Sequence, residues 1–202
     1  MLYTKISAIL LSAGLSSRMA GRDKLHILFK GKTLLERAVS LLDCLPFHEK
    51  IMVTTAERLM HVSLPIGIRP IINPMPWDGQ SSSLRLGVKA ASGEFFLFMA
   101  ADQPLLDKDV LLALINAAEE NHGKIIYPTS GCVPSSPALF PAEFREELLS
   151  LSGDVGGRSI MRKYPKSCYP VEIEKAIKLQ DIDTQKDLLL LADAENKNRS
   201  FY

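Results

Sequence analysis

Short apolar segments alternate with amphipathic segments along most of the chain. Apolar runs of strand length recur at 6–12, 50–55, 67–73, 94–101 and 124–128. Between them, apolar residues return at helical spacing over 34–42, 81–91 and 107–118. Strands that alternate with helices favour a parallel sheet with right-handed crossovers and helices on both faces. The pattern therefore predicts an α/β fold, a three-layer α/β/α sandwich around a Rossmann-like, mostly parallel sheet.

Shorter elements are expected in the remaining intervals. They are a helix at 56–62, an extended segment at 137–140, a helix at 144–151, a glycine-rich loop at 153–157, a short helix ending at Tyr164, a strand at 176–180 and a closing helix at 184–192. No internal repeat, low-complexity segment or linker interrupts this order. We therefore expect one domain over residues 1–202, in which 195–202 is polar enough to form a loose tail.

The composition is that of an ordinary globular protein. Of the 202 residues, 47% are hydrophobic and 23% are charged, and the net charge is +1. This balance gives no strong field that would attract nucleic acid or a membrane surface. No apolar run approaches the roughly 20 residues of a membrane span, and we expect the N-terminal run to be a first strand, not a signal peptide.

Cysteine and histidine are sparse and scattered. The three cysteines, Cys44, Cys132 and Cys168, lie far apart, and no Cys-x-x-Cys pair occurs. The four histidines show no spacing that is typical of a metal site. The sequence indicates neither a zinc site nor a disulfide framework, so we expect reduced thiols in a cytoplasmic protein.

Three loops that carry polar and charged residues follow predicted strands. In open α/β sheets, ligands bind at the carboxyl ends of the strands. The three loops span 13–24, 73–83 and 102–106. We therefore expect the functional site where these loops meet.

The loop at 13–24 has residue types suited to phosphate binding. Its small residues let the backbone approach a phosphate, its hydroxyls can donate hydrogen bonds, and its cations can neutralise a triphosphate. The residues concerned are Ala13, Gly14, Ser16, Ser17, Arg18 and Lys24. The loop is not a Rossmann fingerprint, and Gly31-Lys32-Thr33 is no Walker A loop because His26 replaces the required glycine. An ordinary solvent-exposed loop is the alternative interpretation.

Two aspartates are candidate metal ligands. Asp102 directly follows the most hydrophobic strand, where a carboxylate can hold Mg²⁺ against phosphate oxygens. A turn or capping role is the alternative, although Asp107 is already placed to cap the next helix. Asp183 could complete the metal coordination. Alternatively, it only precedes a helix start, because the residues from Thr184 to Asp187 match a capping box.

The loop at 73–83 adds candidates for nucleotide binding. Gln80, Ser81 and Ser82 lie at the start of a predicted helix, whose N-terminus favours anions. One of the serines could instead simply cap that helix. Trp77 could stack on a heterocycle or pack against the protein.

The loop at 153–158 has the composition of a clamp for an acceptor phosphate. Asp154, Gly156 and Arg158 combine a carboxylate, flexible backbone and a guanidinium. An ordinary interhelical loop is the alternative.

Several of these segments, in order, resemble one known family. Leu11 to Met19 followed by Lys24 resembles the signature loop of MobA-like nucleotidyltransferases with the nucleotide-diphospho-sugar transferase fold, and most closely that of molybdenum cofactor cytidylyltransferases. The resemblance continues through Asn73-Pro74…Gly79-Gln80-Ser81-Ser82-Ser83-Leu84, Ala101-Asp102-Gln103-Pro104, Gly153-Asp154-x-Gly156-Gly157-Arg158 and Asp181-Ile182-Asp183-Thr184…Asp187-Leu188. The ordered set covers nearly the whole chain and is specific at the superfamily level.

The resemblance implies transfer of a cytidylyl group from CTP to the terminal phosphate of a molybdopterin-type molybdenum cofactor, with release of pyrophosphate. It also implies Mg²⁺, or Mn²⁺, as the cofactor and a handoff of the product to a molybdenum hydroxylase. Guanylyl-transferring relatives tend to have two glycines where this chain has Ala13-Gly14, which favours cytosine.

Carried over by position, the resemblance assigns roles to residues already singled out. The catalytic group is Arg18, Lys24 and Asp102, and Asp102 holds the metal. The nucleotide contacts are Ala13, Gly14, Ser16, Ser17, Gln80, Ser81 and Ser82. The acceptor is expected to face Asp154, Gly156 and Arg158.

Two departures from the family pattern keep alternatives open. Because Ala20 is an extra residue before the lysine, Arg22 competes with Lys24 for the lysine's role. Ser135-Ser136 stands where the family tends to have Gly-His, so a sugar-phosphate or polyol-phosphate acceptor is the second candidate. A nucleotide- or cofactor-binding protein without catalysis is the third.

Overall fold

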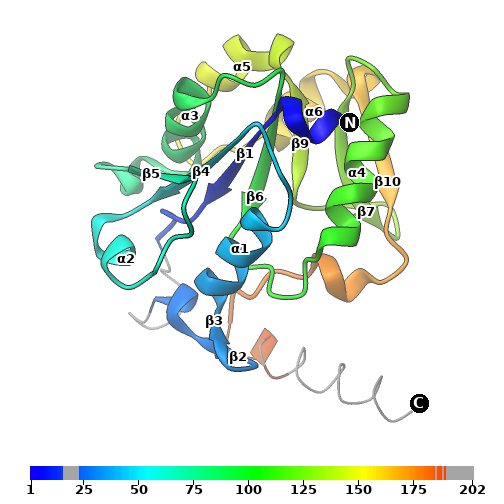
Figure 1. Ribbon diagram of the computed structural model, residues 1–202. Coiled ribbons are helices and arrows are strands. Elements are labelled where there is room, and N and C mark those ends of the chain that lie inside the picture. The colour runs from blue at the N-terminus through cyan, green and yellow to red at the C-terminus, as the bar shows by residue number, and fades with distance from the viewer. Residues whose placement is uncertain (16–22, 185, 188, 190–202) are drawn as a thin grey trace, which may run out of the picture.

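The computed structural model describes the chain except for residues 16–22, 185, 188 and 190–202. An eight-stranded sheet runs through its centre in the order β10-β7-β9-β6-β1-β4-β5, with β8 paired to β7 (Figure 1). Its strands are β1 (Ile6–Leu11), β4 (Glu49–Thr54), β5 (Ile68–Ile72), β6 (Phe95–Ala100), β7 (Ile125–Ser130), β8 (Val133–Pro134), β9 (Ala138–Pro141) and β10 (Cys168–Glu172). Two short strands, β2 (Leu28–Phe29) and β3 (Lys32–Thr33), form a separate antiparallel pair.

Helices cover both faces of the sheet (Figure 1). The α-helices are α1 (Leu34–Asp43), α2 (Ala56–Met60), α3 (Gln80–Ala90), α4 (Lys108–Glu120), α5 (Arg145–Leu149) and α6 (Arg158–Lys163). Short 3-10 helices are η1 (Leu2–Lys5), η2 (Lys24–His26), η3 (Pro76–Asp78), η4 (Ala142–Phe144), η5 (Pro165–Ser167) and η6 (Ala176–Leu179). Leu10 of β1 is buried in one cluster with α1 and α4, whereas its neighbour Ile9 is buried in another with α3, α5 and α6. Successive strand residues thus serve opposite faces, which confirms the predicted three-layer sandwich.

The central parallel strands end at one edge of the sheet. β1 is parallel to both β4 and β6, and Leu11 at its end is paired with Val53 and Ala100. β4 is in turn parallel to β5, where Thr54 is paired with Ile72. The loops that follow β1, β5 and β6 therefore lie at the same carboxyl edge, as the sequence predicts.

One core strand runs against its neighbours. β9 lies between β6 and β7 and is antiparallel to both. Sequence analysis predicted only an extended segment here. Because Leu139 and Phe140 of this strand are almost fully buried, the segment is a central part of the sheet. The sheet is therefore mixed, although most of its pairings are parallel.

The predicted strand at 176–180 is wrong. Residues 176–179 form the 3-10 helix η6, and Leu179 packs with Leu106 and Val110 beside α4. Apolar residues two apart fit this single turn as well as they fit a strand. The strand of this region is instead β10, at the edge of the sheet, where Pro170 is tolerated and three of its five residues are exposed. The apolar pattern of β10 is weak, which explains why the sequence does not predict this strand.

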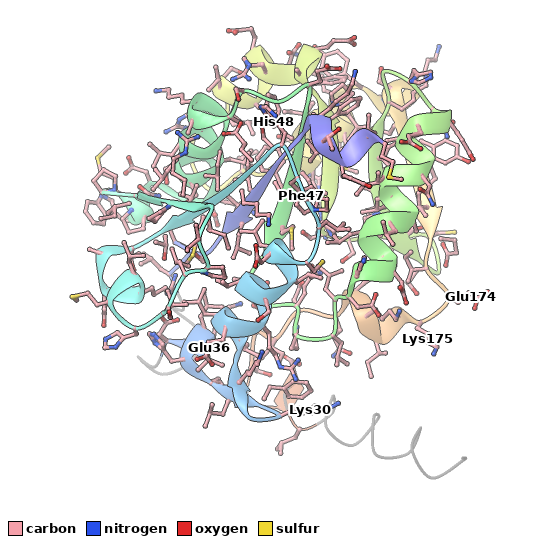
Figure 2. The ribbon with its side chains drawn as sticks, viewed as in Figure 1. Lys30, Glu36, Phe47, His48, Glu174 and Lys175 are labelled. Atoms are coloured by element: carbon pink, nitrogen blue, oxygen red, sulfur yellow. The ribbon has the colours of Figure 1, made fainter. Side chains whose placement is uncertain are left out.

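The segment Gly31-Lys32-Thr33 belongs to a hairpin and a helix cap. Lys30 and Gly31 both have positive φ, at 53° and 77°, as two-residue hairpin turns require. Thr33 and Glu36 form a reciprocal capping box at the start of α1. Figure 2 shows Lys30 at the tip of the hairpin and Glu36 on the first turn of α1. The structure therefore supports the rejection of a Walker A loop here.

Near the C-terminus, most of the expected helix at 184–192 and the whole tail at 195–202 lie outside the described residues. Across the described part of the chain, no helix combines the length and apolar character needed to cross a membrane.

Candidate active site

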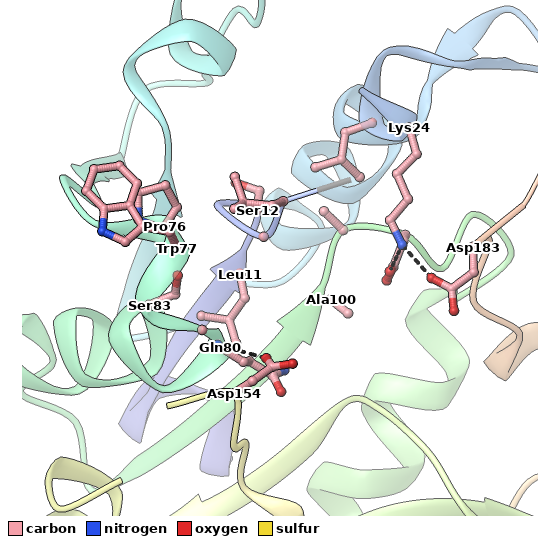
Figure 3. Close-up of a pocket in the computed structure, with 16 residues that line it drawn as sticks. Leu11, Ser12, Lys24, Pro76, Trp77, Gln80, Ser83, Ala100, Asp154 and Asp183 are labelled. Atoms are coloured by element: carbon pink, nitrogen blue, oxygen red, sulfur yellow. Dashed lines mark hydrogen bonds and ion pairs between the residues drawn. The ribbon is translucent and has the colours of Figure 1, made fainter. Parts of the chain in front are cut away.

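A cavity of about 560 Å³ opens at the carboxyl edge of the sheet (Figure 3). Residues after β1, β5 and β6 line it together with residues from the 153–157 loop and the C-terminal segment. The lining consists of Leu11, Ser12, Gly14, Leu15, Lys24, Leu25, Pro76, Trp77, Gly79, Gln80, Ser83, Ala100, Ala101, Asp102, Asp154 and Asp183. The three predicted loops thus meet around one cavity.

Lys24 lies between two aspartates on one side of this cavity. Its Nζ is 2.6 Å from Oδ2 of Asp102 and 2.9 Å from Oδ1 of Asp183 (Figure 3). The side chains of Lys24 and Asp102 are only 17% and 21% exposed, so solvent screens this ion pair incompletely. Three residues far apart in the sequence thereby form one charged cluster.

Backbone contacts bring Asp183 to that cluster. The Ile182 N–H donates to the Asp102 carbonyl oxygen at 2.9 Å, and the Ile182 side chain is fully buried. The helix-start role goes to Thr184 and Asp187, because the Asp187 carboxylate accepts from the Thr184 N–H at 2.7 Å. The carboxylate of Asp183 is instead directed at Lys24.

Two ionisable groups at this site, Lys24 and Asp181, have shifted pKa values. Burial lowers the pKa of Lys24, but the charges and hydrogen bonds of Asp102 and Asp183 outweigh it, so the net shift is upward. Lys24 is therefore a cation at neutral pH. Burial, followed by the charge of Asp102, raises the pKa of Asp181 to about 6. Negative charge is thus concentrated here, with Lys24 as a compensating cation.

Asp102 also has an oxygen suited to a divalent cation. Its Oδ1 is buried and has no hydrogen-bond partner within the described residues. Buried acceptors without a partner are costly, and a cation would satisfy this one. The described residues contain no cluster of three or more acidic, histidine or cysteine ligands. A cation at Asp102 and Asp183 would therefore need phosphate or water oxygens as well, as Mg²⁺ commonly does.

Two of the three serines at the start of α3 do not line the cavity. Ser81 and Ser82 are buried, and neither lines the cavity. The Ser82 hydroxyl donates to the Gly79 carbonyl at 2.8 Å and accepts from Nδ2 of Asn73 at 2.8 Å. The wall itself is formed here by Gln80 and Ser83. The hydroxyl of Ser82 is thus engaged within the protein, and nucleotide contacts by Ser81 and Ser82 stay a prediction.

The 153–158 loop contributes one residue to the cavity and caps α3. Asp154 lines the cavity, and its Oδ1 accepts from the Gln80 N–H at 3.3 Å. Gly156 packs against Gln80, where any Cβ would collide with that side chain. Arg158 lies off the wall, with its Nη2 donating to the Pro134 carbonyl at 2.9 Å. The helix start is thus held by protein groups and is not an open anion site.

The close contact at Gly79 yields a prediction for stability. Gly79 has a φ of +83°, and a Cβ there would lie 2.5 Å from the backbone nitrogen of Asp154. We expect Gly79→Ala to lower the free energy of unfolding by about 1–3 kcal/mol, because both strain and a backbone clash arise. Thermal unfolding measures the effect. Gly14→Ala is the matched control, since nothing lies within 4 Å of its Cβ position. An unchanged melting temperature for Gly79→Ala would contradict the packing described.

The loop at 13–24 is described only at its two ends, 13–15 and 23–24. Gly14 lines the cavity, while Ala13 is fully buried beneath it. The predicted residues Ser16, Ser17 and Arg18, and the competitor Arg22, lie outside the described residues.

Trp77 lines the cavity, and its sequence position alone did not decide between ligand stacking and packing against the protein. It is 67% exposed, so packing against the protein does not account for it. Figure 3 shows Trp77 and Pro76 on the side of the cavity opposite Lys24 and Asp183. Its position between a predicted strand and a predicted helix was the available signal. The cavity therefore has an aromatic side and a charged side.

Solved structures share the whole fold. A protein from Mycobacterium sp. strain JC1 has a TM-score of 0.82 at 19% identity, over 96% of this chain and 99% of its own. A Mycobacterium tuberculosis protein solved in complex with manganese has a TM-score of 0.78 at 18% identity, over 93% and 97%. A 4-diphosphocytidyl-2C-methyl-D-erythritol synthase from Anaerococcus prevotii has 0.75 at 18%, over 96% and 98%. The fold is therefore of the nucleotide-diphospho-sugar transferase type.

Curated relatives are more similar in sequence. The chain is 28% identical to a molybdenum cofactor cytidylyltransferase of Escherichia coli, over 91% of this chain and 94% of that protein. It is 27% identical to a molybdenum cofactor guanylyltransferase of Histophilus somni, over 63% of this chain. That match spans 65% of the guanylyltransferase, slightly less than two thirds of its length.

A family model described as the MobA-like NTP transferase domain matches residues 8–168. This span includes Lys24, Trp77, Asp102 and Asp154, which line the cavity from four segments of the chain. Because the match covers well over half of the chain, the chain belongs to the MobA-like NTP transferase family.

Proposed function

We propose that this chain transfers a nucleotidyl group, CMP from CTP, to the phosphate of a molybdopterin-type molybdenum cofactor and releases pyrophosphate. The observation that carries the proposal is the cluster of Lys24, Asp102 and Asp183 inside a cavity at the carboxyl edge of the sheet. A cavity of about 560 Å³ lies within the usual range for small-molecule sites. Family membership supports a triphosphate as one substrate.

In this mechanism an oxygen of the acceptor phosphate attacks the α-phosphorus in line. A new P–O bond forms, and the bond to the β-phosphate oxygen breaks. The acceptor is already ionised at neutral pH, so the site needs no strong general base. Catalysis then rests on positioning and on charge stabilisation.

In this proposal, cations of the loop at 13–24 stabilise the negative charge that develops during the transfer. Lys24, kept protonated by its two carboxylate neighbours, would stabilise negative charge on the α-phosphoryl group and the departing pyrophosphate. Arg18 is proposed to share this role. When bound, a divalent cation at Asp102 and Asp183, Mg²⁺ or Mn²⁺, would neutralise further charge on the phosphate oxygens.

Ser135-Ser136, which stands where the resembling family tends to have Gly-His, bears on the identity of the acceptor. Nε2 of Gln103 donates to the Ser135 hydroxyl at 3.3 Å and to the Ser136 carbonyl at 3.1 Å. Neither serine lines the cavity. The departure therefore leaves the described cavity wall unaltered. Support for a molybdopterin-type acceptor as the first choice comes from the curated molybdenum cofactor nucleotidyltransferases. The likeness to a synthase of a cytidylylated polyol phosphate keeps a polyol-phosphate acceptor as the second candidate.

Pyrophosphate release tests the proposal directly. The protein is incubated with Mg²⁺ and each of CTP, GTP, ATP and UTP, with molybdenum cofactor or a polyol phosphate as acceptor. We expect the fastest release with CTP and molybdenum cofactor. Faster release with a polyol phosphate would favour the second candidate.

Binding can be followed separately because Trp77 is the single tryptophan of the chain and lines the cavity. We expect its fluorescence to change on addition of CTP, and Trp77→Phe supplies the background. Binding of CTP without pyrophosphate release, in the presence of a competent acceptor, would favour a non-catalytic protein. No binding of any triphosphate would contradict the proposed function.

A further inference from the structure

Arg58 of α2 forms hydrogen bonds with both ends of the loop at 13–24, which lines the cavity. Among the residues that the structure describes, it is the one charged residue that is almost fully buried, with 5% exposed. Its Nε and Nη2 donate to the two carboxylate oxygens of Asp23, at 2.5 and 2.9 Å. Its Nη1 donates to the Ser12 carbonyl, and Nη2 donates to the Gly14 carbonyl at 2.9 Å. One guanidinium therefore holds four oxygens.

These oxygens come from the two ends of the same loop. Ser12 and Gly14 lie within three residues of the end of β1, whereas Asp23 directly precedes η2. The guanidinium is thus a cross-link that fixes the residues after β1 and the residue before η2 relative to each other.

The fold delivers Arg58 to this position through β4. Thr55 follows β4 and caps α2, with its hydroxyl accepting from the Arg58 N–H at 3.3 Å. β4 lies beside β1, and the Ser12 N–H donates to the Val53 carbonyl at 2.8 Å. The first residues of the loop and the N-terminus of α2 are therefore held next to each other by the sheet.

The cross-link continues from Asp23 to the charged cluster. Asp23 is the N-cap of η2, and its Oδ1 accepts from the Leu25 N–H at 3.1 Å. Leu25 is buried and anchors this short turn. Lys24 lies between these two fixed residues, and its Nζ reaches Asp102. The position of Asp23 therefore determines where the Lys24 side chain enters the cavity.

We propose that Arg58 is a positioning residue of the nucleotide site, acting through the loop ends and Asp23 to place Gly14 and Lys24 for triphosphate binding. The inference rests on the proposed function of the cavity. Arg58 does not line the cavity, so its effect reaches the substrate through other residues. Only a planar fork with several N–H donors can serve four separate oxygens, and a lysine cannot replace it.

Nucleotide affinity is the first test. Arg58→Lys keeps the positive charge but loses the fork, and Arg58→Ala loses both. We expect each variant to bind CTP about tenfold more weakly by Trp77 fluorescence, because charge-assisted hydrogen bonds that fix the loop are lost. Guanidinium ion at low millimolar concentration should restore binding to Arg58→Ala and not to Arg58→Lys. Arg69→Ala is the control, since Arg69 pairs with Glu49 at 2.9 Å on an exposed part of β5 and should keep wild-type affinity.

The Asp23 partner gives an independent test. Asp23→Asn leaves Arg58 in place, so it also serves if Arg58→Ala does not fold. We expect Asp23→Asn to weaken CTP binding in the same direction as Arg58→Lys. The double variant Arg58→Lys/Asp23→Asn should be no weaker than Arg58→Lys alone, because that substitution already removes the contact with Asp23.

Two outcomes would overturn the inference in different ways. Wild-type CTP affinity in both Arg58→Lys and Asp23→Asn would show that the contact only stabilises the fold, even if the melting temperature falls. If the wild-type protein and Arg69→Ala bind no triphosphate, the proposed function fails, and the role of Arg58 fails with it.

Discussion

Asp102→Ala is expected to lower turnover about 10²–10³-fold, the usual cost of removing one well-placed electrostatic group from an active site. The substitution removes a direct partner of Lys24 at 2.6 Å and the buried oxygen Oδ1 suited to a cation. Its side chain lies on the cavity wall and not in the apolar core, so the fold should persist. Pyrophosphate release measures the effect, and thermal unfolding shows that the protein is still folded.

A matched pair elsewhere in the chain supplies the control. Asp43 also lies 2.6 Å from a lysine, Lys50, but neither residue lines the cavity. Asp43→Asn should therefore leave turnover unchanged, and Asp102→Asn should lower it. Wild-type turnover in Asp102→Ala would refute the assignment of Asp102.

Lys24→Met is the second change from which we expect a large effect, a loss of about 10²-fold or more in turnover. Methionine preserves much of the side-chain volume but removes the cation between Asp102 and Asp183. The carboxylates would then face one another without compensation, so the melting temperature should fall as well. Lys50→Met is the control, because Lys50 is 16% exposed against 17% for Lys24 and also pairs with an aspartate.

Arg22→Ala decides between the two candidates for the family lysine. The position of Lys24 in the cavity leads us to expect that Lys24→Met loses more activity than Arg22→Ala. If Arg22→Ala alone loses turnover, the extra residue in the loop has transferred the role to Arg22.

Most of the fold could be predicted because its central strands and helices have strong periodic patterns. β1, β4 and β6 each contain a run of at least three apolar residues, and their parallel direction follows from the helices between the strands. β10 could not be recognised in this way, since an edge strand with Pro170 and exposed side chains needs little apolar sequence. The antiparallel direction of β9 could not be predicted either, because the apolar pattern of a short strand is the same whichever way the strand runs in the sheet.

The position of a cavity residue was predictable where it lies within three residues of the end of a strand, as Gly14 and Asp102 do. Asp183 was undecided because its position depends on the hydrogen bond from Ile182 to Asp102, a contact between distant segments. Ser81 and Ser82 show the opposite limit, because hydroxyls at a helix start look like ligands in the sequence. In the fold, the Ser82 hydroxyl accepts from Asn73 and donates to the Gly79 carbonyl, and the Ser81 hydroxyl accepts from Arg85. Arg58 follows a glutamate in a short helix, a sequence typical of a solvated surface, and only the tertiary structure reveals its four contacts.

The hydrogen bond between Ile182 and Asp102 also bears on how this protein should be produced and divided. The family match ends at residue 168, which lies at the first residue of β10 and before Asp183. An expression fragment cut at that boundary would keep Lys24 and Asp102 but lose most of an edge strand and the cavity residue Asp183. The smallest fragment that preserves the charged cluster and the Thr184–Asp187 turn therefore extends to at least residue 187.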